Sequence, residues 1–213
     1  MRLPGAAPPN LVYNTGMPTP LPPSFYDRDV VETARALLGM RLVRRLEDGT
    51  TLSGIITETE AYRGQDDQAC HARNGRTRRN AVMFGPPGRA YVYFTYGMHW
   101  CLNVVAGPDG FPAAVLLRAI HPLEGLDFIA LRRARAERRH WTNGPAKLTQ
   151  ALAIDGALNG CDLTDPASPL CILPGTPPPA ERITAGARVG LGATPEPWLS
   201  MPWRFTFPLE LEQ

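Results

Sequence analysis

The spacing of apolar residues predicts a helix followed by a β-hairpin near the start of the chain. Residues 27–38 place apolar side chains on one helical face, and Asp27 or Asp29 can cap the first turn. Residues 40–46 and 50–62 are rich in apolar and β-branched side chains, which is typical of strands. An Asp-Gly pair between them favours a tight turn. The second strand is therefore expected to be supported by the first.

The middle of the chain is predicted to contain a long loop and three further strands. Residues 63–88 are polar and rich in arginine, and loops of this length are commonly functional or disordered. Residues 90–95 and 101–106 have strand composition on either side of a Tyr-Gly bend, and residues 113–120 form an almost entirely apolar third strand. Arg118 interrupts that strand and needs a partner. A salt bridge within the fold and a contact with phosphate or water at a site are equally open alternatives.

Two helices and three short strands are predicted for the rest of the chain. Residues 122–139 have helical composition with a cationic end, and residues 142–145 open a second helix with Lys147 in its first turn. The helix dipole disfavours a cation at that position, so a nearby phosphate would account for Lys147. Short strands separated by Pro- and Gly-rich turns are expected at residues 169–175, 183–191 and 202–207.

Polar side chains of the 50–62 strand fall on one face. Because side chains alternate along a strand, Glu58, Glu60 and Tyr62 point to the same side of the sheet. Burying two carboxylates is costly unless they have partners or a chemical task. His71 follows after a short acidic loop, and a Glu, a Tyr and a His close together can line a pocket for proton transfer. The alternative is an edge strand with a solvated polar face.

Aromatic and basic residues in the following segment favour a nucleic-acid site. Tyr91 and Tyr93 share a strand face, and Tyr96 follows at the bend. Four arginines precede them in the loop: Arg73, Arg76, Arg78 and Arg79. Aromatic rings can stack on bases and arginines can pair with phosphates, so this combination is typical of nucleic-acid binding. Aromatic clusters are also common in protein cores, which is the alternative interpretation.

Charge is distributed unevenly along the 213 residues, although the net charge is only +2. Residues 63–147 contain 13 Lys+Arg against 6 Asp+Glu, whereas residues 1–62 contain 6 against 7 and residues 148–213 contain 3 against 7. A basic middle between acidic flanks fits a polyanionic partner. The alternative is a solvated helix face, because five of the positive residues lie between Arg132 and Arg139.

Composition limits the remaining function classes. The 4 cysteines lack zinc or iron–sulfur spacing, so we expect reduced and mostly buried thiols. No apolar run approaches the ~18 residues of a membrane span, and the N-terminus lacks a continuous apolar signal core. We therefore expect no membrane partner and a cytoplasmic location, associated with the nucleoid if the protein is bacterial. Residues 1–24 contain seven prolines and are expected to form a disordered or loosely packed arm.

Several short motifs, taken together, resemble the alkyladenine DNA glycosylases, which are also called 3-methyladenine or methylpurine DNA glycosylases. The motifs occur in the same order across roughly residues 25–207, which makes the resemblance specific although each motif alone is weak. The matching positions are residues 58–62, 71–73, 79–80, 83–84, 91–93, 96–98, 103, 116–119, 122–125, 144–145 and 147–148.

The resemblance implies an α+β fold, with a single domain built on a curved, mostly antiparallel β-sheet flanked by helices. Residues 25–213 would form this DNA glycosylase domain after the 1–24 arm. The resemblance further implies a monofunctional base-excision enzyme with no metal and no other cofactor. Its partner would be double-stranded DNA containing damaged purines, such as 3-methyladenine, with hypoxanthine and ethenoadenine as further candidates. We expect a monomer, because the partner is a long polymer.

The same resemblance implies roles for individual residues. Glu60 would activate the attacking water, and Tyr96 would enter the duplex through the minor groove in place of the flipped base. Asn103 would disfavour guanine by clashing with its amino group, and Arg118 would support the water and a nearby phosphate. The base-binding pocket would comprise Tyr62, His71, Tyr93 and Asn103. The residues expected to contact the DNA backbone are Arg73, Arg76, Arg79 and Lys147.

The chain departs from the family's pattern at a few positions. The loop between His71 and Asn80 is slightly shorter than in the mammalian pattern, and Arg78 stands where proline is expected. His99 and Trp100 follow the bend in place of other aromatic residues. These differences bear on loop conformation, DNA affinity and lesion range rather than on the reaction type.

Two other functions are compatible with single features of the sequence. A DNA-binding module without catalysis would use the same basic loop and aromatic bend, with Glu60 in a structural role. A metal nuclease or zinc deaminase could use Asp66, Asp67 and His71 as ligands, although the His-x-Glu and Pro-Cys-x-x-Cys pattern of the deaminases is absent. A lyase would need an amine, and only Lys147 or the N-terminus could supply it, so we expect hydrolysis without strand cleavage.

Overall fold

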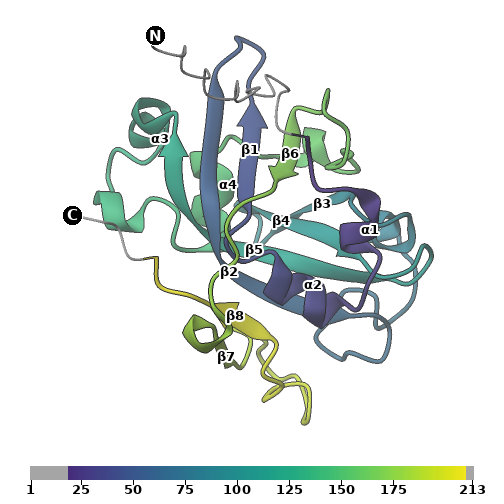
Figure 1. The fold of residues 1–213 in the computed structure, drawn as a ribbon. Helices are drawn as coiled ribbons and strands as arrows, with labels where there is room; N and C mark the ends of the chain where they lie inside the picture. The colour runs from purple at the N-terminus through teal and green to yellow at the C-terminus, as the bar shows by residue number, and fades with distance from the viewer. Residues whose placement is uncertain (1–18, 210–213) are drawn as a thin grey trace, which may run out of the picture.

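The long strand β2 (Thr51–Arg63) is the centre of the computed structural model, which describes residues 19–209 (Figure 1). It pairs antiparallel with β1 (Arg41–Arg45), β5 (Ala113–Glu124) and β8 (Arg204–Thr206). Residues 51–55 pair with β1 and residues 58–60 pair with β8, while β5 runs along the other edge. Register shifts around Glu58 mark a bulge, which bends the strand where its partner changes.

The other strands extend the sheet on both sides of β2. They are β3 (Ala90–Thr95), β4 (His99–Ala106), β6 (Leu170–Leu173) and β7 (Thr184–Gly186). The order is β3-β4-β5-β2-β1-β6, with β7 added through β8, and every pairing is antiparallel. Figure 1 shows β3, β4 and β5 turned away from the direction of β1 and β6, so the sheet is curved. The predicted single-domain α+β fold with a curved antiparallel sheet is confirmed.

Short helices cover the sheet. They are α1 (Pro23–Tyr26), α2 (Val30–Ala36), α3 (Leu126–Arg132) and α4 (Pro145–Ala151), with 3₁₀ turns at Ala81–Phe84, Arg138–His140, Gly156–Leu158 and Ala180–Arg182. Asp29, one of the two predicted caps, accepts hydrogen bonds from the amides of Val31 and Glu32 at the start of α2. α2 packs on β2 and β5, and α4 packs on β4 and β5.

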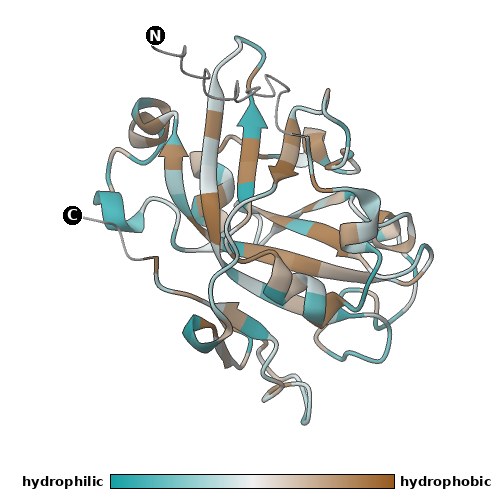
Figure 2. Cartoon of the chain, in the orientation of Figure 1, coloured by the Kyte–Doolittle hydropathy of each residue, from teal (hydrophilic) through white to brown (hydrophobic). Residues whose placement is uncertain are grey.

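Apolar side chains of the strands and helices meet in one main core. Figure 2 shows apolar residues concentrated along the strands, while the connecting loops are mostly hydrophilic. Fully buried members of this core include Leu37, Ile56, Leu117 and Phe205. Truncating a side chain of this kind to alanine typically costs about 2–5 kcal/mol, so the core fixes the position of β2 firmly.

The two faces of β2 have different partners, as the alternation of its side chains predicts. Thr59 is buried, and its hydroxyl donates to the Ala34 carbonyl of α2 at 2.8 Å. Glu58 and Glu60 therefore point away from α2, to the opposite face of the sheet. On that face Arg118 of β5 contacts both carboxylates. The polar face of this strand is an enclosed site rather than a solvated edge.

The helix predicted for residues 122–139 is wrong over most of its length. β5 continues to Glu124, where it still pairs with β2, and α3 occupies only residues 126–132. Gly125 separates the two elements with a φ of 70°, and a Cβ there would meet a Leu52 side-chain carbon at 2.2 Å. Apolar periodicity could not distinguish an extended strand end from a helix, because Leu123 and Leu131 are exposed.

The tail and the arm also differ from the prediction. Strands occur at residues 170–173 and 204–206, but the predicted strand 183–191 ends at Gly186. Residues 1–18 of the predicted arm lie outside the described residues. The end of the arm is packed, because Leu21 is buried and its amide donates to the Ile172 carbonyl of β6 at 2.8 Å. The folded part thus begins before residue 25.

Candidate active site

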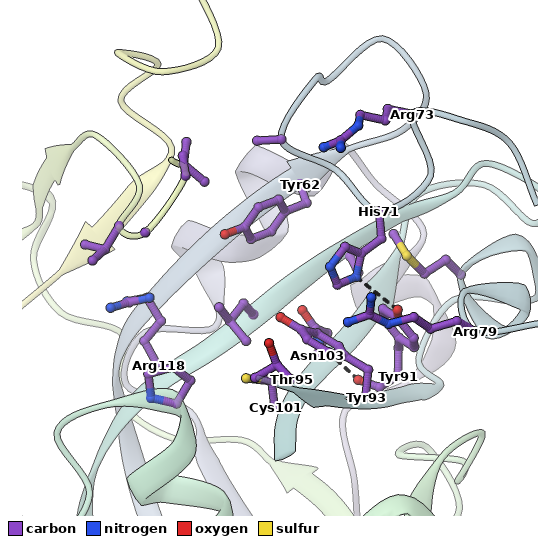
Figure 3. Close-up of a pocket in the computed structure, with 18 of the residues that line it drawn as sticks. Tyr62, His71, Arg73, Arg79, Tyr91, Tyr93, Thr95, Cys101, Asn103 and Arg118 are labelled. Atoms are coloured by element: carbon purple, nitrogen blue, oxygen red, sulfur yellow. Dashed lines mark hydrogen bonds between the residues drawn. The ribbon is translucent and has the colours of Figure 1, made fainter. Parts of the chain in front are cut away.

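The polar face of β2 borders a cavity of about 570 Å³ (Figure 3). It lies between the long loop of residues 64–80, strands β3 to β5, the start of α4, and residues 189–194 of the tail. Most of the predicted site residues line it: Tyr62, His71, Arg73, Arg79, Tyr93, Tyr96, Asn103 and Arg118. Side chains separated by more than a hundred positions in the sequence meet here, so the fold assembles one site from the separate sequence motifs.

Glu60 lies immediately behind this cavity. Its side chain is fully buried, and both carboxylate oxygens have donors. The Val189 amide donates to Oε1 at 2.7 Å, and the Tyr62 hydroxyl donates to Oε2 at 2.9 Å. The Arg118 guanidinium lies 3.3 Å from Oε2. Two hydrogen-bond donors and one cation, which belong to three different segments, therefore compensate the burial of this anion.

Arg118 ties Glu60 to the second carboxylate of the strand. Its Nε donates to Glu58 Oε1 at 2.8 Å, and Arg204 of β8 lies 3.3 Å from the same oxygen. The ion pair that the sequence analysis considered for Arg118 is present. Arg118 also lines the cavity, so its guanidinium is accessible to a ligand from the other side. Its contact with a water or a phosphate stays a prediction.

The environment of Glu60 shifts its protonation in opposing ways. Burial raises the pKa of Glu60, whereas Arg118, the Val189 amide and the Tyr62 hydroxyl lower that pKa, and the net direction is upward. Burial, together with the neighbouring Glu60, raises the pKa of Tyr62 well above its usual value. Tyr62 consequently stays protonated and keeps its donor role toward the carboxylate. A carboxyl with a raised pKa in a cavity is a candidate for proton transfer.

An aromatic wall stands across the cavity from Tyr62. His71 packs edge-on against Tyr93 with ring centroids 4.5 Å apart, and its Nδ1 lies 3.0 Å from the Tyr91 hydroxyl. Desolvation, reinforced by Arg79 and Arg73, lowers the pKa of His71 to about 4, so the ring is neutral at pH 7. Figure 3 shows Tyr62 on one side of the cavity, with His71 and Tyr93 facing it. A flat aromatic ligand fits between such walls.

Asn103 lies on the cavity floor on β4. Its side-chain Nδ2 donates to the Tyr91 carbonyl at 3.1 Å, which fixes the side chain to the neighbouring strand. Asn103 is buried and also lines the cavity. A rigid polar group at this position can discriminate between ligands by hydrogen bonding or by steric exclusion.

Exposed apolar side chains form the tip of the β3–β4 hairpin at the mouth of the cavity. Tyr96 is 81% exposed and Met98 is 65% exposed, and Phe94 beside them is 45% exposed. Tyr96 has a φ of 52°, a left-handed conformation that tyrosine rarely adopts, and Gly97 follows at 66°. Strained residues of this kind persist where the surrounding structure holds them, and they are frequent at functional sites.

The predicted backbone contacts divide into two groups. Arg73 and Arg79 line the cavity, and Arg79 lies over the Tyr93 ring with 5.0 Å to its centroid. Arg76 is exposed on the loop and does not line the cavity. Lys147 also lies outside the cavity, where its amine donates to the Asn143 side chain at 2.8 Å, although the nearby Pro145 is part of the rim.

Sequence analysis missed the tail segment of residues 188–194. Val189, Leu191 and Thr194 line the cavity, and the Val189 amide contacts Glu60. The buried Arg188 beside them pairs with Asp67, at the foot of the long loop. A lone arginine in a Gly-rich stretch is the signal that could have identified this segment, but its partner lies 121 positions away.

The alternative metal site of Asp66, Asp67 and His71 does not form. Asp67 is occupied by Arg188 and by the amides of Arg63 and Ala69. In the part of the chain that the structure describes, no three His, Cys, Asp or Glu side chains come together as metal ligands. Within residues 19–209, no helix is both long enough and apolar enough to cross a membrane.

Comparison with known families decides what kind of enzyme this cavity belongs to. Residues 24–210 match the model of the methylpurine-DNA glycosylase (MPG) family. The chain belongs to this family. It is therefore a DNA-repair glycosylase, a hydrolase that acts on N-glycosyl bonds and has damaged DNA as its partner.

Similar proteins from several microorganisms agree with this assignment. A protein of Carboxydothermus hydrogenoformans is 51% identical over 185 residues, which is 87% of this chain and 93% of that protein. Proteins of Methanocella arvoryzae and Anaeromyxobacter dehalogenans are each 48% identical over 186 residues, covering 87% of this chain and 90% and 80% of those proteins. Each carries the name "Putative 3-methyladenine DNA glycosylase".

Proposed function

We propose that this glycosylase extracts a damaged purine nucleotide from duplex DNA and hydrolyses its N-glycosidic bond with a water activated by Glu60, leaving an abasic site. The observation that carries the proposal is the buried carboxylate of Glu60, held by two hydrogen-bond donors and an arginine directly behind an aromatic-walled cavity. A general base needs this combination of a positioned carboxylate and a cavity for the reacting group.

The chemical step is attack of water on the anomeric carbon of deoxyribose through an oxocarbenium-like transition state. Glu60 acts as an ionised carboxylate, because it must accept the proton of the water and stabilise the positive charge that develops on the sugar. Glu60 has no exposed surface, so the water must take a place beside one of its present donors. Two of these partners, Arg118 and Tyr62, line the cavity.

The aromatic walls bind the extracted base. Tyr62 stacks on one face of the purine, and His71 and Tyr93 contact the other. N-alkylated purines such as 3-methyladenine carry positive charge, which adds cation–π attraction to stacking, and a neutral His71 does not repel them. Asn103 disfavours guanine by clashing with its amino group. Hypoxanthine and ethenoadenine are further candidate substrates, although their neutral rings need more help to leave.

The hairpin tip and the surrounding cations bind the duplex. Tyr96 inserts into the stack through the minor groove and fills the space of the extracted base, which offsets unstacking of a few kcal/mol. The DNA backbone is held by Arg73, Arg76, Arg79 and Lys147. A lyase step would need an amine at the sugar, and Lys147 lies outside the cavity, so we expect the reaction to stop at the abasic site without strand cleavage. The protein acts as a monomer on its polymeric partner.

Base release from duplex oligonucleotides tests this proposal. Duplexes containing hypoxanthine, ethenoadenine or an alkylated purine are incubated with native protein and with Glu60→Gln, and abasic sites are then revealed with hot alkali. Native protein is expected to release at least one of these bases. Glu60→Gln keeps the size of the side chain but should lower the single-turnover rate by about 10²–10⁴-fold while still binding the DNA.

The same experiment distinguishes the proposed glycosylase from a non-catalytic DNA-binding module. A non-catalytic damaged-DNA-binding module would bind these duplexes tightly, release no base, and be indifferent to Glu60→Gln. That outcome would contradict the proposal. Strand breaks that appear without alkali, or a borohydride-stable adduct with DNA, would contradict the monofunctional mechanism.

A further inference from the structure

Arg188 is a fully buried cation behind the wall of the cavity, and it is held by an equally buried partner. Its Nη1 lies 2.5 Å from Asp67 Oδ2 and its Nη2 lies 2.9 Å from Asp67 Oδ1, with both side chains 0% exposed. This is a bidentate pair, the arrangement for which the planar guanidinium is suited. Burying such a pair is costly and adds little net stability, so its presence points to a role other than stability.

The same guanidinium connects three segments that build the cavity. It donates to the Ala61 carbonyl of β2 at 2.9 Å and to the Trp198 carbonyl of the tail at 3.1 Å. It also lies over two rings, with 4.8 Å to the Tyr62 centroid and 5.1 Å to the Trp203 centroid. β2, the long loop and the tail therefore share one anchoring group.

Several contacts of Arg188 lead directly to residues of the proposed site. The next residue, Val189, donates its amide to Glu60, and Tyr62, whose ring Arg188 contacts, donates its hydroxyl to Glu60. Asp67 accepts hydrogen bonds from the amides of Arg63 and Ala69, where the loop that carries the His71 wall begins. Displacing Arg188 would loosen both hydrogen-bond donors of Glu60 at once.

We propose that Arg188 is a positioning residue, which holds the Val189 amide and the Tyr62 hydroxyl on Glu60 and so keeps that carboxylate in its reactive place. This inference rests on the proposed role of Glu60 as the general base. Arg188 does not line the cavity and touches no reacting atom, so it acts through Val189 and Tyr62.

Lysine is the informative replacement for Arg188, because it keeps the positive charge but lacks the planar guanidinium. One ammonium cannot bind both oxygens of Asp67, both carbonyls and the faces of two rings together. The groups that face Glu60 are Glu58 and Tyr62 of β2, Arg118 of β5 and Cys101 of β4, together with the Val189 amide. Arg188→Lys leaves all these side chains in place, but it changes how the Val189 amide and the Tyr62 hydroxyl are held against Glu60.

The experiment compares Arg188→Lys with native protein and with Arg45→Lys. Arg45 of β1 similarly donates to two carbonyls, those of Pro166 and Ser168, but lies outside the cavity lining. Single-turnover base release is measured against pH on the duplex from which the native enzyme releases the base, beside thermal unfolding and binding to an abasic-site duplex. For Arg188→Lys we expect a rate about 10–100-fold lower, with binding largely kept.

The pH profile distinguishes positioning from general destabilisation. A weaker Val189 hydrogen bond raises the pKa of Glu60, so the acid limb of the Arg188→Lys profile should move to higher pH. Arg45→Lys should lower the unfolding temperature while leaving the limb in place. Should Arg188→Lys fail to fold, Asp67→Asn, which weakens the same pair from its other side, is expected to lower the rate in the same way while binding to the abasic-site duplex is kept.

Two results would have different meanings. A folded Arg188→Lys or Asp67→Asn enzyme with the native rate and pH profile would overturn the positioning role and leave the proposed function intact. Failure of native protein to release any base would instead contradict the proposed function itself, and with it the role of Glu60 on which this inference rests.

Discussion

The rear of the cavity and the tip of the hairpin at its mouth accommodate unfavourable groups in opposite ways. At the rear, Glu60 is an anion without exposed surface, and Arg118, Tyr62 and Val189 compensate each of its oxygens. At the mouth, Tyr96 is 81% exposed and holds a left-handed backbone conformation, and it has no comparable set of partners within the described residues. The rear is complete without a ligand, whereas the mouth exposes apolar surface that only a ligand would cover.

This difference matches the two tasks of a glycosylase. Stabilising a developing charge requires donors that are already oriented, since reorientation during the reaction would cost energy. Entering a duplex requires an apolar wedge that becomes buried on binding and offsets unstacking. We therefore expect changes at the rear to act on stability, pH dependence and rate, and changes at the mouth to act on DNA binding.

The largest effect on stability is expected for Arg118→Met. It leaves Glu60 buried without its main cationic partner, and breaking such a pair typically costs about 3–5 kcal/mol. Chemical denaturation at pH 7 measures this loss. The pKa of Glu60, already raised, would rise further, so the penalty should be present above that pKa and shrink as the pH falls through it.

Arg204→Met is the matched control for this change. Arg204 contacts Glu58, and its side chain is 35% exposed. Its removal should therefore lower the free energy of unfolding far less. Two results would contradict the view that the rear wall compensates a buried anion. One is an equal loss of unfolding free energy in the two variants, and the other is a loss in Arg118→Met that does not depend on pH.

Most of the fold on which this wall depends could be predicted from local pattern. Period-two alternation placed Glu58, Glu60 and Tyr62 on one face, and the Arg118 contacts confirm it. The 122–139 helix could not be corrected from the sequence, because β5 is extended to Glu124 by pairing with β2. That pairing is a tertiary constraint that local propensity does not contain.

The candidate site was predictable where motifs lie close together in sequence. Tyr62 and His71 are close in the chain, and both line the cavity. The contributions of Arg188 and Val189 were not predictable, since their partners Asp67 and Glu60 are more than a hundred residues away. The Val189 contact also uses a backbone amide, which leaves no trace in the side-chain pattern.

At the mouth, Tyr96→Ala should weaken binding to a damaged duplex without weakening the fold. Base–aromatic stacking is worth about 1–3 kcal/mol, so we expect a loss of roughly 5–150-fold in affinity. Because Tyr96 carries no charge, the dependence of binding on salt should keep its slope. Fluorescence anisotropy across a salt series measures both quantities on a duplex with a stable base analogue.

Tyr96→Phe is the control, since it keeps the ring and removes only the hydroxyl. It should bind nearly as tightly as the native protein. If Tyr96→Ala instead lowered the unfolding temperature and left affinity unchanged, the hairpin tip would be a structural element, and the contrast with the rear wall would fail.

The smallest effect is expected at His71, between the two regions. The pKa of His71 falls from 6.5 to about 4 in the folded protein, through desolvation and the nearby Arg79 and Arg73. The unfolded chain therefore binds a proton first, and stability is lost as the pH falls from 6.5 toward 4. His71→Gln has no titrating side chain, so its unfolding temperature should decline less than that of native protein over this range.

The expected difference is small, because His71 is exposed at the cavity and solvent screens its charge. Parallel declines for the two proteins would show that His71 keeps its ordinary pKa, and its ring would then become cationic as the pH falls below about 6.5, where it would repel the alkylated purines that the pocket is proposed to bind.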